Sequence, residues 1–174
     1  MFRELHLACA GVEPTAAHRA LAAFETGARA RGASFTLITQ NVDGLHQRAG
    51  SQNVCEYHGS LARWRCDRCG LERDGYEESH CGEPMRPCVV LFGEEIPPAP
   101  ERDAKIALRD CDLFVAIGTS GTVFPAANFV RSAAYAGART VLLNLEIDAS
   151  SRELYAECHA GPADELVPGF FAVT

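Results

Sequence analysis

The sequence predicts an α/β fold, in which a parallel β-sheet carries helices on both faces and a small module is inserted. Three short runs of apolar and β-branched residues predict strands at 34–38, 113–117 and 140–143. Apolar positions recur at helical spacing at 98–109 and 125–136. Alternation of strand and helix is typical of parallel sheets, because a crossover helix returns the chain to the starting end.

An amphipathic helix is predicted ahead of the first strand, over residues 15–31. Pro14 precedes this segment and Gly32 follows it, as is usual at the two ends of a helix. The apolar positions that share one face are Ala17, Leu21, Phe24 and Ala28. We therefore expect a surface helix with one buried face.

Each predicted strand ends in polar or small residues. Residues 39–44, 118–120 and 144–146 follow the three strands in turn. Ligands of open parallel sheets bind beyond the carboxyl ends of the strands. The sequence therefore predicts one shared pocket at that edge of the sheet.

Size and charge limit the class of protein. The 174 residues suffice for one large domain, expected at 1–60 and 88–174, and a small module at 61–87. A net charge of -7 gives no electrostatic footprint for nucleic acid, so we expect protein partners instead. No run approaches the ~20 apolar residues that span a bilayer, and we see no targeting signal. We therefore expect a cytoplasmic protein without a membrane partner.

The segment 61–87 is rich in cysteine, arginine and glycine. Cys66 and Cys69 have the Cys-x-x-Cys spacing with which two thiolates bind one zinc ion, and Gly70 relieves the turn. Cys81 offers a third thiolate. We interpret the module as a zinc ribbon, with a metal-free ribbon and a redox disulfide between Cys66 and Cys69 as the alternatives.

The sequence leaves the fourth zinc ligand open. His80 is the best chemical candidate, since imidazole is a common zinc ligand, although ligands at adjacent positions are geometrically awkward. Glu78 stands three residues before Cys81, where a second Cys-x-x-Cys pair would begin. The metal ligands that we predict are Cys66, Cys69, Cys81 and His80. The scattered cysteines, interpreted as small buried hydrophobes, are Cys9, Cys55, Cys111 and Cys158.

Four segments carry an ordered set of motifs. They are TQNVDGLHQRAG at 39–50, HGS at 58–60, RPCVVLFGE at 86–94, and GTS at 118–120 with PAA at 125–127. Together, in this order and spacing, they resemble the sirtuin family of NAD-dependent protein lysine deacylases. The resemblance extends from about Pro14 to the end of the chain.

The resemblance implies a Rossmann-like large domain and a zinc-ribbon small domain, with NAD and an acylated lysine of a protein meeting in the cleft between them. It also implies the reaction. The acyl oxygen attacks the nicotinamide ribose, nicotinamide leaves, and the acyl group ends on ADP-ribose. Acetyl is the acyl group expected by default.

Several roles follow from the resemblance for the first two motifs. His58 would be the general base that takes a proton from a ribose hydroxyl, and the alternative is a strand-end histidine bound to backbone. Gln40, Asn41 and Asp43 would line the nicotinamide and ribose pocket, and the alternative is capping of a loop.

The later motifs would complete the cofactor and substrate sites. The cofactor residues implied there are Gly118, Thr119 and Ser120 for ADP-ribose, Asn144 and Glu146 for the adenosine ribose, and Ala163. The residues implied for the acyl-lysine channel are Val89, Phe92, Gly93 and Glu94. A peptide would add there as a strand, while an ordinary turn at 118–120 and an ordinary buried strand at 89–92 are the alternatives.

The chain departs from the family pattern at its start. Family members begin with a strand that feeds a Gly-Ala-Gly loop for the NAD diphosphate, and no paired glycines precede Gln40. We therefore expect a sheet that lacks this first strand, with a homo- or hetero-oligomer covering the open edge. Two other functions stay open: a truncated, catalytically silent module that binds acyl-lysine or protein, and a protein ADP-ribosyltransferase.

Overall fold

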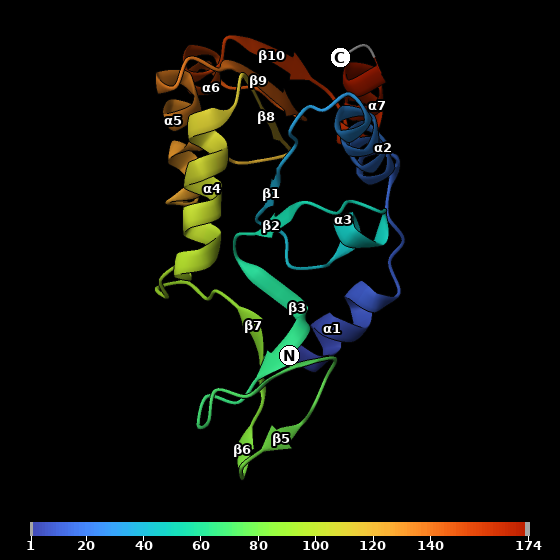
Figure 1. Ribbon diagram of the computed structural model, residues 1–174, viewed down its shortest axis with the longest axis vertical. Coiled ribbons are helices and arrows are strands. Elements are labelled where there is room, and N and C mark those ends of the chain that lie inside the picture. The colour runs from blue at the N-terminus through green and yellow to red at the C-terminus, as the bar shows by residue number, and fades with distance from the viewer. Residues whose placement is uncertain (1, 173–174) are drawn as a thin grey trace.

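The computed structural model describes residues 2–172 (Figure 1). The strands of the larger part lie between helices on both sides, and a smaller antiparallel module extends from its lower end. Strand and helix alternate through the second half of the chain, as the sequence predicts. Among the helices of residues 2–172, none is long and apolar enough to cross a membrane.

Three parallel strands form the larger of two parallel sheets. They are β8 (Leu113–Ile117), β9 (Arg139–Asn144) and β10 (Glu157–Ala160), in the order β10-β9-β8. Four consecutive residues of the central strand, from Thr140 to Leu143, are at most 4% exposed. The strands predicted at 113–117 and 140–143 are confirmed, because continuous apolar runs suit strands covered on both faces.

The second parallel sheet holds β1 (Leu37–Thr39) and β2 (Val54–Glu56). The strand predicted at 34–38 begins later, because its pairing with β2 starts at Leu37 opposite Val54. Ahead of this pairing, the Phe35 carbonyl oxygen accepts from the Asn53 side chain at 2.6 Å. Within the described chain β1 pairs with β2 alone and β8 with β9 alone. The parallel α/β class is confirmed, and β1 and β8 each keep one edge without a strand partner in this part of the chain.

Helices cover both faces of the parallel strands (Figure 1). Their bounds are α2 (Ala16–Ala30), α3 (Leu45–Arg48), α4 (Pro98–Asp110), η1 (Ala126–Asn128), α5 (Phe129–Tyr135), α6 (Ala149–Leu154) and α7 (Ala163–Ala172). Leu21 of α2 and Val167 of α7 join Leu37 and Leu143 in the main core. The helices predicted at 15–31 and 98–109 are confirmed, whereas the segment 125–136 divides into a 3-10 turn and a short α-helix.

The small module is an antiparallel ribbon. Its strands are β3 (Gly59–Arg65), β4 (Glu72–Asp74), β5 (Ser79–His80), β6 (Glu83–Pro84) and β7 (Arg86–Val89). Helix α1 (Phe2–Ala10) lies against this ribbon: Nδ1 of His6 is 3.0 Å from the Leu61 carbonyl oxygen, and Phe2 packs beside buried Trp64. Helix α1, which the sequence assigns to the large domain, therefore contacts the ribbon through Phe2 and His6.

The two parts meet at a close crossing of backbone at Gly59, the first residue of β3. Gly59 has φ +83°, in the region that favours glycine. A Cβ atom at this position would stand 2.0 Å from the carbonyl oxygen of Cys88 on β7. Only the absence of a side chain allows β3 and β7 to pair here, where Gly59 is opposite Val89.

Gly59→Ala should destabilise the protein by about 2–5 kcal/mol, because overpacking against a backbone carbonyl adds to left-handed strain. Urea unfolding followed by circular dichroism measures this loss. Gly75→Ala is the matched control: Gly75 has φ +81° and no atom within 4 Å of a built Cβ, so it carries the strain of about 1–2 kcal/mol alone. Equal losses in the two variants would contradict the crowding at Gly59.

Candidate active site

His58 lies at the junction between β2 and β3, and its ring is half-buried. Nδ1 of the ring is 3.2 Å from the backbone carbonyl oxygen of Gln40. Because a carbonyl oxygen can only accept, Nδ1 carries the hydrogen in this contact. The neutral ring then has its lone pair on Nε2, which is the form a general base requires.

Three elements hold the backbone around His58. The N–H of Val90, just after β7, donates to the His58 carbonyl oxygen at 2.9 Å, and the N–H of Tyr57 donates to the Thr39 carbonyl oxygen at 2.9 Å. The buried hydroxyl of Tyr57 donates to Oε2 of Glu101 on α4 at 2.5 Å. The imidazole is therefore carried on a backbone with little freedom to move.

Two of the predicted site residues that follow β1, Asn41 and Asp43, have different surroundings. Asn41 is exposed, and its N–H donates to Oγ1 of Thr39 at 3.1 Å. Oδ1 of Asp43 accepts from the N–H of Leu45 at 2.9 Å and so closes the turn that leads into α3. The capping role, which the sequence offers as the alternative for Asp43, is present here, and a role toward a ligand stays a prediction.

The turn after β8 is open to solvent. Gly118 has φ +60°, and no atom lies within 4 Å of a Cβ built on it. Its N–H donates to the Leu143 carbonyl oxygen at 2.9 Å, and the side-chain amide of Asn144 donates to the Thr119 carbonyl oxygen at 3.1 Å. Hydroxyl groups of Thr119 and Ser120 thus stand on a turn fixed by the end of β9.

The other cofactor residues expected from the sequence fall in different surroundings. Glu146 is exposed just after β9. Ala163 begins α7 and packs against the main core, so its methyl group serves the fold. The N–H of Gly161 donates to the Asn144 carbonyl oxygen at 2.9 Å, which brings the start of α7 to the end of β9.

A small apolar cluster links the His58 region to the chain that follows the Gly118 turn. The ring of Tyr57 contacts Phe129 edge to face, with centroids 4.9 Å apart, and Ile38 and Ala126 join the same cluster. The segment between β2 and β3 that carries His58 and the segment after β8 therefore share a packed contact. Convergence of Gln40, His58 and Gly118 on one cavity stays a prediction.

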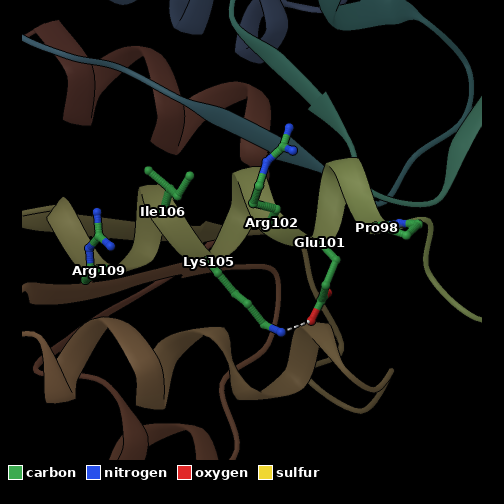
Figure 2. Close-up of a pocket in the computed structure, with 6 residues that line it drawn as sticks. All are labelled: Pro98, Glu101, Arg102, Lys105, Ile106 and Arg109. Carbon is green, nitrogen blue, oxygen red and sulfur yellow. Dashed lines mark ion pairs between the residues drawn. The ribbon is translucent and has the colours of Figure 1, made fainter.

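One hollow of the structure lies elsewhere, on the outer surface of α4 (Figure 2). Pro98, Glu101, Lys105 and three other α4 residues line it, and Lys105 forms an ion pair with Glu101 at 2.8 Å across it. Because a single helix supplies the whole lining, the hollow is a surface groove. We place the site by the geometry at His58 instead.

The segment after β7 presents the residues expected to contact a peptide. Val89 is buried, while Phe92 is 100% exposed and Gly93 has φ +89°. Arg86 grips both carboxylate oxygens of Glu94, at 2.6 and 3.0 Å, and this guanidinium, with the N–H of Leu91, lowers the pKa of Glu94 to about 2. The loop is thus held in place with an uncovered phenyl ring at its tip.

The cysteine cluster consists of Cys66, Cys69 and Cys81, whose sulfur atoms all lie within 4.8 Å of one another. A thiolate set at this spacing fits Zn²⁺, which prefers sulfur ligands at about 2.3 Å. The N–H of Leu71 holds the pKa of Cys69 below its usual range. The His80 ring is outside the cluster: it faces Glu77 at 4.0 Å, and the His80 carbonyl oxygen accepts from Sγ of Cys66.

Three residues that support the site are absent from the sequence prediction: Tyr57, Glu101 and Arg86. Tyr57 and Glu101 form a hydrogen bond although they are 44 positions apart in the sequence, and Arg86 anchors the loop through its ion pair with Glu94. The sequence gives no signal for the Tyr57–Glu101 pair, because neither residue type is distinctive alone. It does give a signal for Arg86, because an arginine and a glutamate eight residues apart in one motif can form an ion pair.

A parallel α/β domain that carries a cysteine-bearing ribbon, with a histidine where the two parts meet, defines the sirtuin class of proteins. The chain belongs to the Sir2 family, whose sequence profile matches residues 1–125.

Two relatives are named NAD-dependent protein deacylase. The protein of Pasteurella multocida is 44% identical over 170 residues, which cover 92% of this chain and 70% of the relative. That of Salmonella typhimurium is 45% identical over 168 residues, covering 91% of this chain and 59% of the relative. The chain thus spans between about six and seven tenths of the length of these relatives.

Solved structures agree with this assignment. A Sir2 homologue in complex with NAD superposes with a TM-score of 0.84 at 31% identity, over 94% of this chain and 65% of that one. Sir2Af2 bound to a myristoylated histone peptide superposes with a TM-score of 0.80 at 32% identity, over 92% and 72%. The fold and the family predicted from the sequence are therefore confirmed.

A second histidine near the site is held in its neutral form. Burial, followed by the neighbouring His18, lowers the pKa of His46 to about 4, against a smaller opposing effect of Asp43. The His18 and His46 rings lie 4.6 Å apart, and within the described structure Nδ1 of His46 is buried without a hydrogen-bond partner.

The free energy of unfolding should therefore fall as the pH drops from about 6.5 toward about 4. In this range the unfolded chain protonates His46 and the folded chain does not. Chemical unfolding at pH 6.5, 5.5 and 4.8 measures the slope, and His46→Gln should flatten it. Carboxylates with lowered pKa begin to contribute below about pH 5, and because they are the same in the parent and the variant, the difference between the two slopes isolates His46. Identical slopes for the variant and the parent would refute the account of His46.

Proposed function

We propose that this chain removes acyl groups, acetyl by default, from lysine side chains of proteins with NAD as co-substrate. The products are nicotinamide, O-acyl-ADP-ribose and the free lysine, and one water molecule balances cleavage of the amide. The observation that carries the proposal is the imidazole of His58, held through Nδ1 by the Gln40 carbonyl oxygen so that Nε2 carries the lone pair, at the meeting point of the two parts.

His58 would accept a proton at Nε2 from a ribose hydroxyl group. The carbonyl oxygen of Gln40 stabilises the imidazolium that forms, because it accepts the hydrogen on Nδ1. Tyr57 acts as a positioning residue, since its hydroxyl ties the strand to Glu101. Proton transfer of this kind contributes a factor of about 10²–10⁴ to a rate.

NAD supplies a ribose carbon from which nicotinamide can leave. The groups available for its sugar hydroxyls and carboxamide are hydroxyls, amides and open backbone: Gln40, Asn41, Gly118, Thr119, Ser120 and Asn144. They suit these functions because both require short-range donors and acceptors. The open space above Gly118 allows a ligand to approach the backbone closely.

The peptide substrate would add as a strand beside β7. β7 is an edge strand in the order β4-β3-β7, so one of its edges has no strand partner within the described chain. At this strand the Val89 carbonyl oxygen accepts from the Arg86 guanidinium at 3.0 Å, a bond that an added strand would have to share or replace. Main-chain hydrogen bonds would supply affinity, and Phe92, Gly93 and Glu94 would contact the side chains that flank the lysine. Because the N–H of Val90 binds the His58 carbonyl oxygen, a peptide added beside β7 would bring its acyl-lysine near the base.

We further propose that this chemistry operates in the cytoplasm, where exposed thiols such as Cys69 and Cys81 stay reduced. The open edges of β1 and β8 suit a further parallel strand, which a second chain in an oligomer would supply. Leu37 of β1 and Val115 of β8 share one core, which supports a strand position between these two elements.

The test combines the purified chain with NAD and an acetyl-lysine peptide, and mass spectrometry reports the products. We expect O-acetyl-ADP-ribose from the parent chain and a loss of about 10²–10⁴-fold in His58→Ala. His159→Ala is the matched control, because this histidine lies on β10 beside Glu157 and should leave the rate unchanged.

Two other outcomes would overturn the proposal. ADP-ribose attached to protein would indicate a transferase, and peptide binding without cleavage of NAD would indicate a catalytically silent module.

A further inference from the structure

The cysteine cluster joins two separate turns of the ribbon. Cys66 and Cys69 lie on the turn after β3, where the N–H of Gly70 donates to the Cys66 carbonyl oxygen at 2.8 Å. Cys81 lies on the turn between β5 and β6. Both turns direct sulfur to one point, since all three atoms lie within 4.8 Å of one another.

The turn that carries Cys81 is held in a conformation that cysteine rarely adopts. Cys81 has φ +55° and Gly82 has φ +78°, between a pair of strands in which His80 is opposite Glu83. Two-residue hairpin turns of this kind favour asparagine, aspartate or glycine at both positions. A cysteine there brings its thiol to the other two at a local cost in backbone strain.

No fourth protein ligand joins the cluster in the part of the chain that the structure describes. The His80 ring faces Glu77, and Glu78, three positions before Cys81, is exposed and outside the cluster. Cys88 lies on β7 opposite Ser60. Structural zinc sites are closed by four protein ligands, whereas sites with three keep a position for an external ligand.

We propose that this cluster binds Zn²⁺ with an open fourth position that accepts a small-molecule thiol. The open side faces solvent, because Cys69 and Cys81 are exposed while Cys66 is buried. The guanidinium of Arg68 lies at this rim, 2.8 Å from the Cys81 carbonyl oxygen, and its charge favours an incoming thiolate. Sulfur also suits a metal that already has three thiolates. This site is independent of the proposed deacylation.

Cobalt spectroscopy of the whole chain tests the proposal without reference to enzyme activity. Co²⁺ replaces Zn²⁺, and the sulfur-to-cobalt absorption reports the number of bound thiolates. With a phosphine reductant in every sample, 2-mercaptoethanol should raise this absorption by about one third, from three thiolates to four. Metal analysis of the zinc form should give one ion per chain.

Two variants distinguish the open site from a closed one. Glu78→Cys, at an exposed position, should show the higher absorption from the start and no response to 2-mercaptoethanol. His80→Ala should respond as the parent does. The proposal fails if 2-mercaptoethanol does not raise the absorption of the parent chain, or if the chain binds no stoichiometric metal. It also fails if His80→Ala changes the spectrum before 2-mercaptoethanol is added. None of these results bears on deacylation, so the two proposals fail separately.

Discussion

The backbone of Gly59 passes so close to the carbonyl group of Cys88 that no side chain fits between them. This crossing fixes the point at which the parallel strands give way to the ribbon. His58 comes directly before Gly59 in the chain, and the N–H of Val90, just after β7, donates to the His58 carbonyl oxygen. The position of the imidazole is thus a consequence of backbone packing, to which the side chain adds a hydrogen bond with the Gln40 carbonyl oxygen and a ring contact with Tyr57.

Support for that crossing comes from both parts of the molecule. On the large side Tyr57 reaches Glu101 of α4 and the ring of Phe129 on α5, so two helices contact the short segment between β2 and His58. On the ribbon side Trp64 is 2% exposed and holds a small core of its own. A residue at the junction of two cores has less freedom than one on a loop, which suits a base that must meet a hydroxyl group at hydrogen-bond distance.

The sequence predicts the fold class and most elements of the large part, because long apolar runs and helical spacing are local properties. The sequence places the strand around Leu37 too early, because the bounds of this strand are set by its pairing with residues 54–56, which are not local in sequence. The position of helix α1 against the ribbon could not be predicted either, because the contact of His6 with the Leu61 carbonyl oxygen is also not local in sequence. The three-cysteine cluster follows from spacing, while the orientation of His80 depends on the hairpin around Cys81.

The central claim is that two groups of residues bind one NAD molecule together: residues 40–43 with His58, and residues 118–120 at the turn after β8. Its most direct test is an NMR titration of the nitrogen-15-labelled chain with NAD. The account predicts that amide signals of residues 40–43, His58 and residues 118–120 move together, with one common dissociation constant. Movement of signals at one of these groups alone, with the others unchanged at saturation, would contradict it.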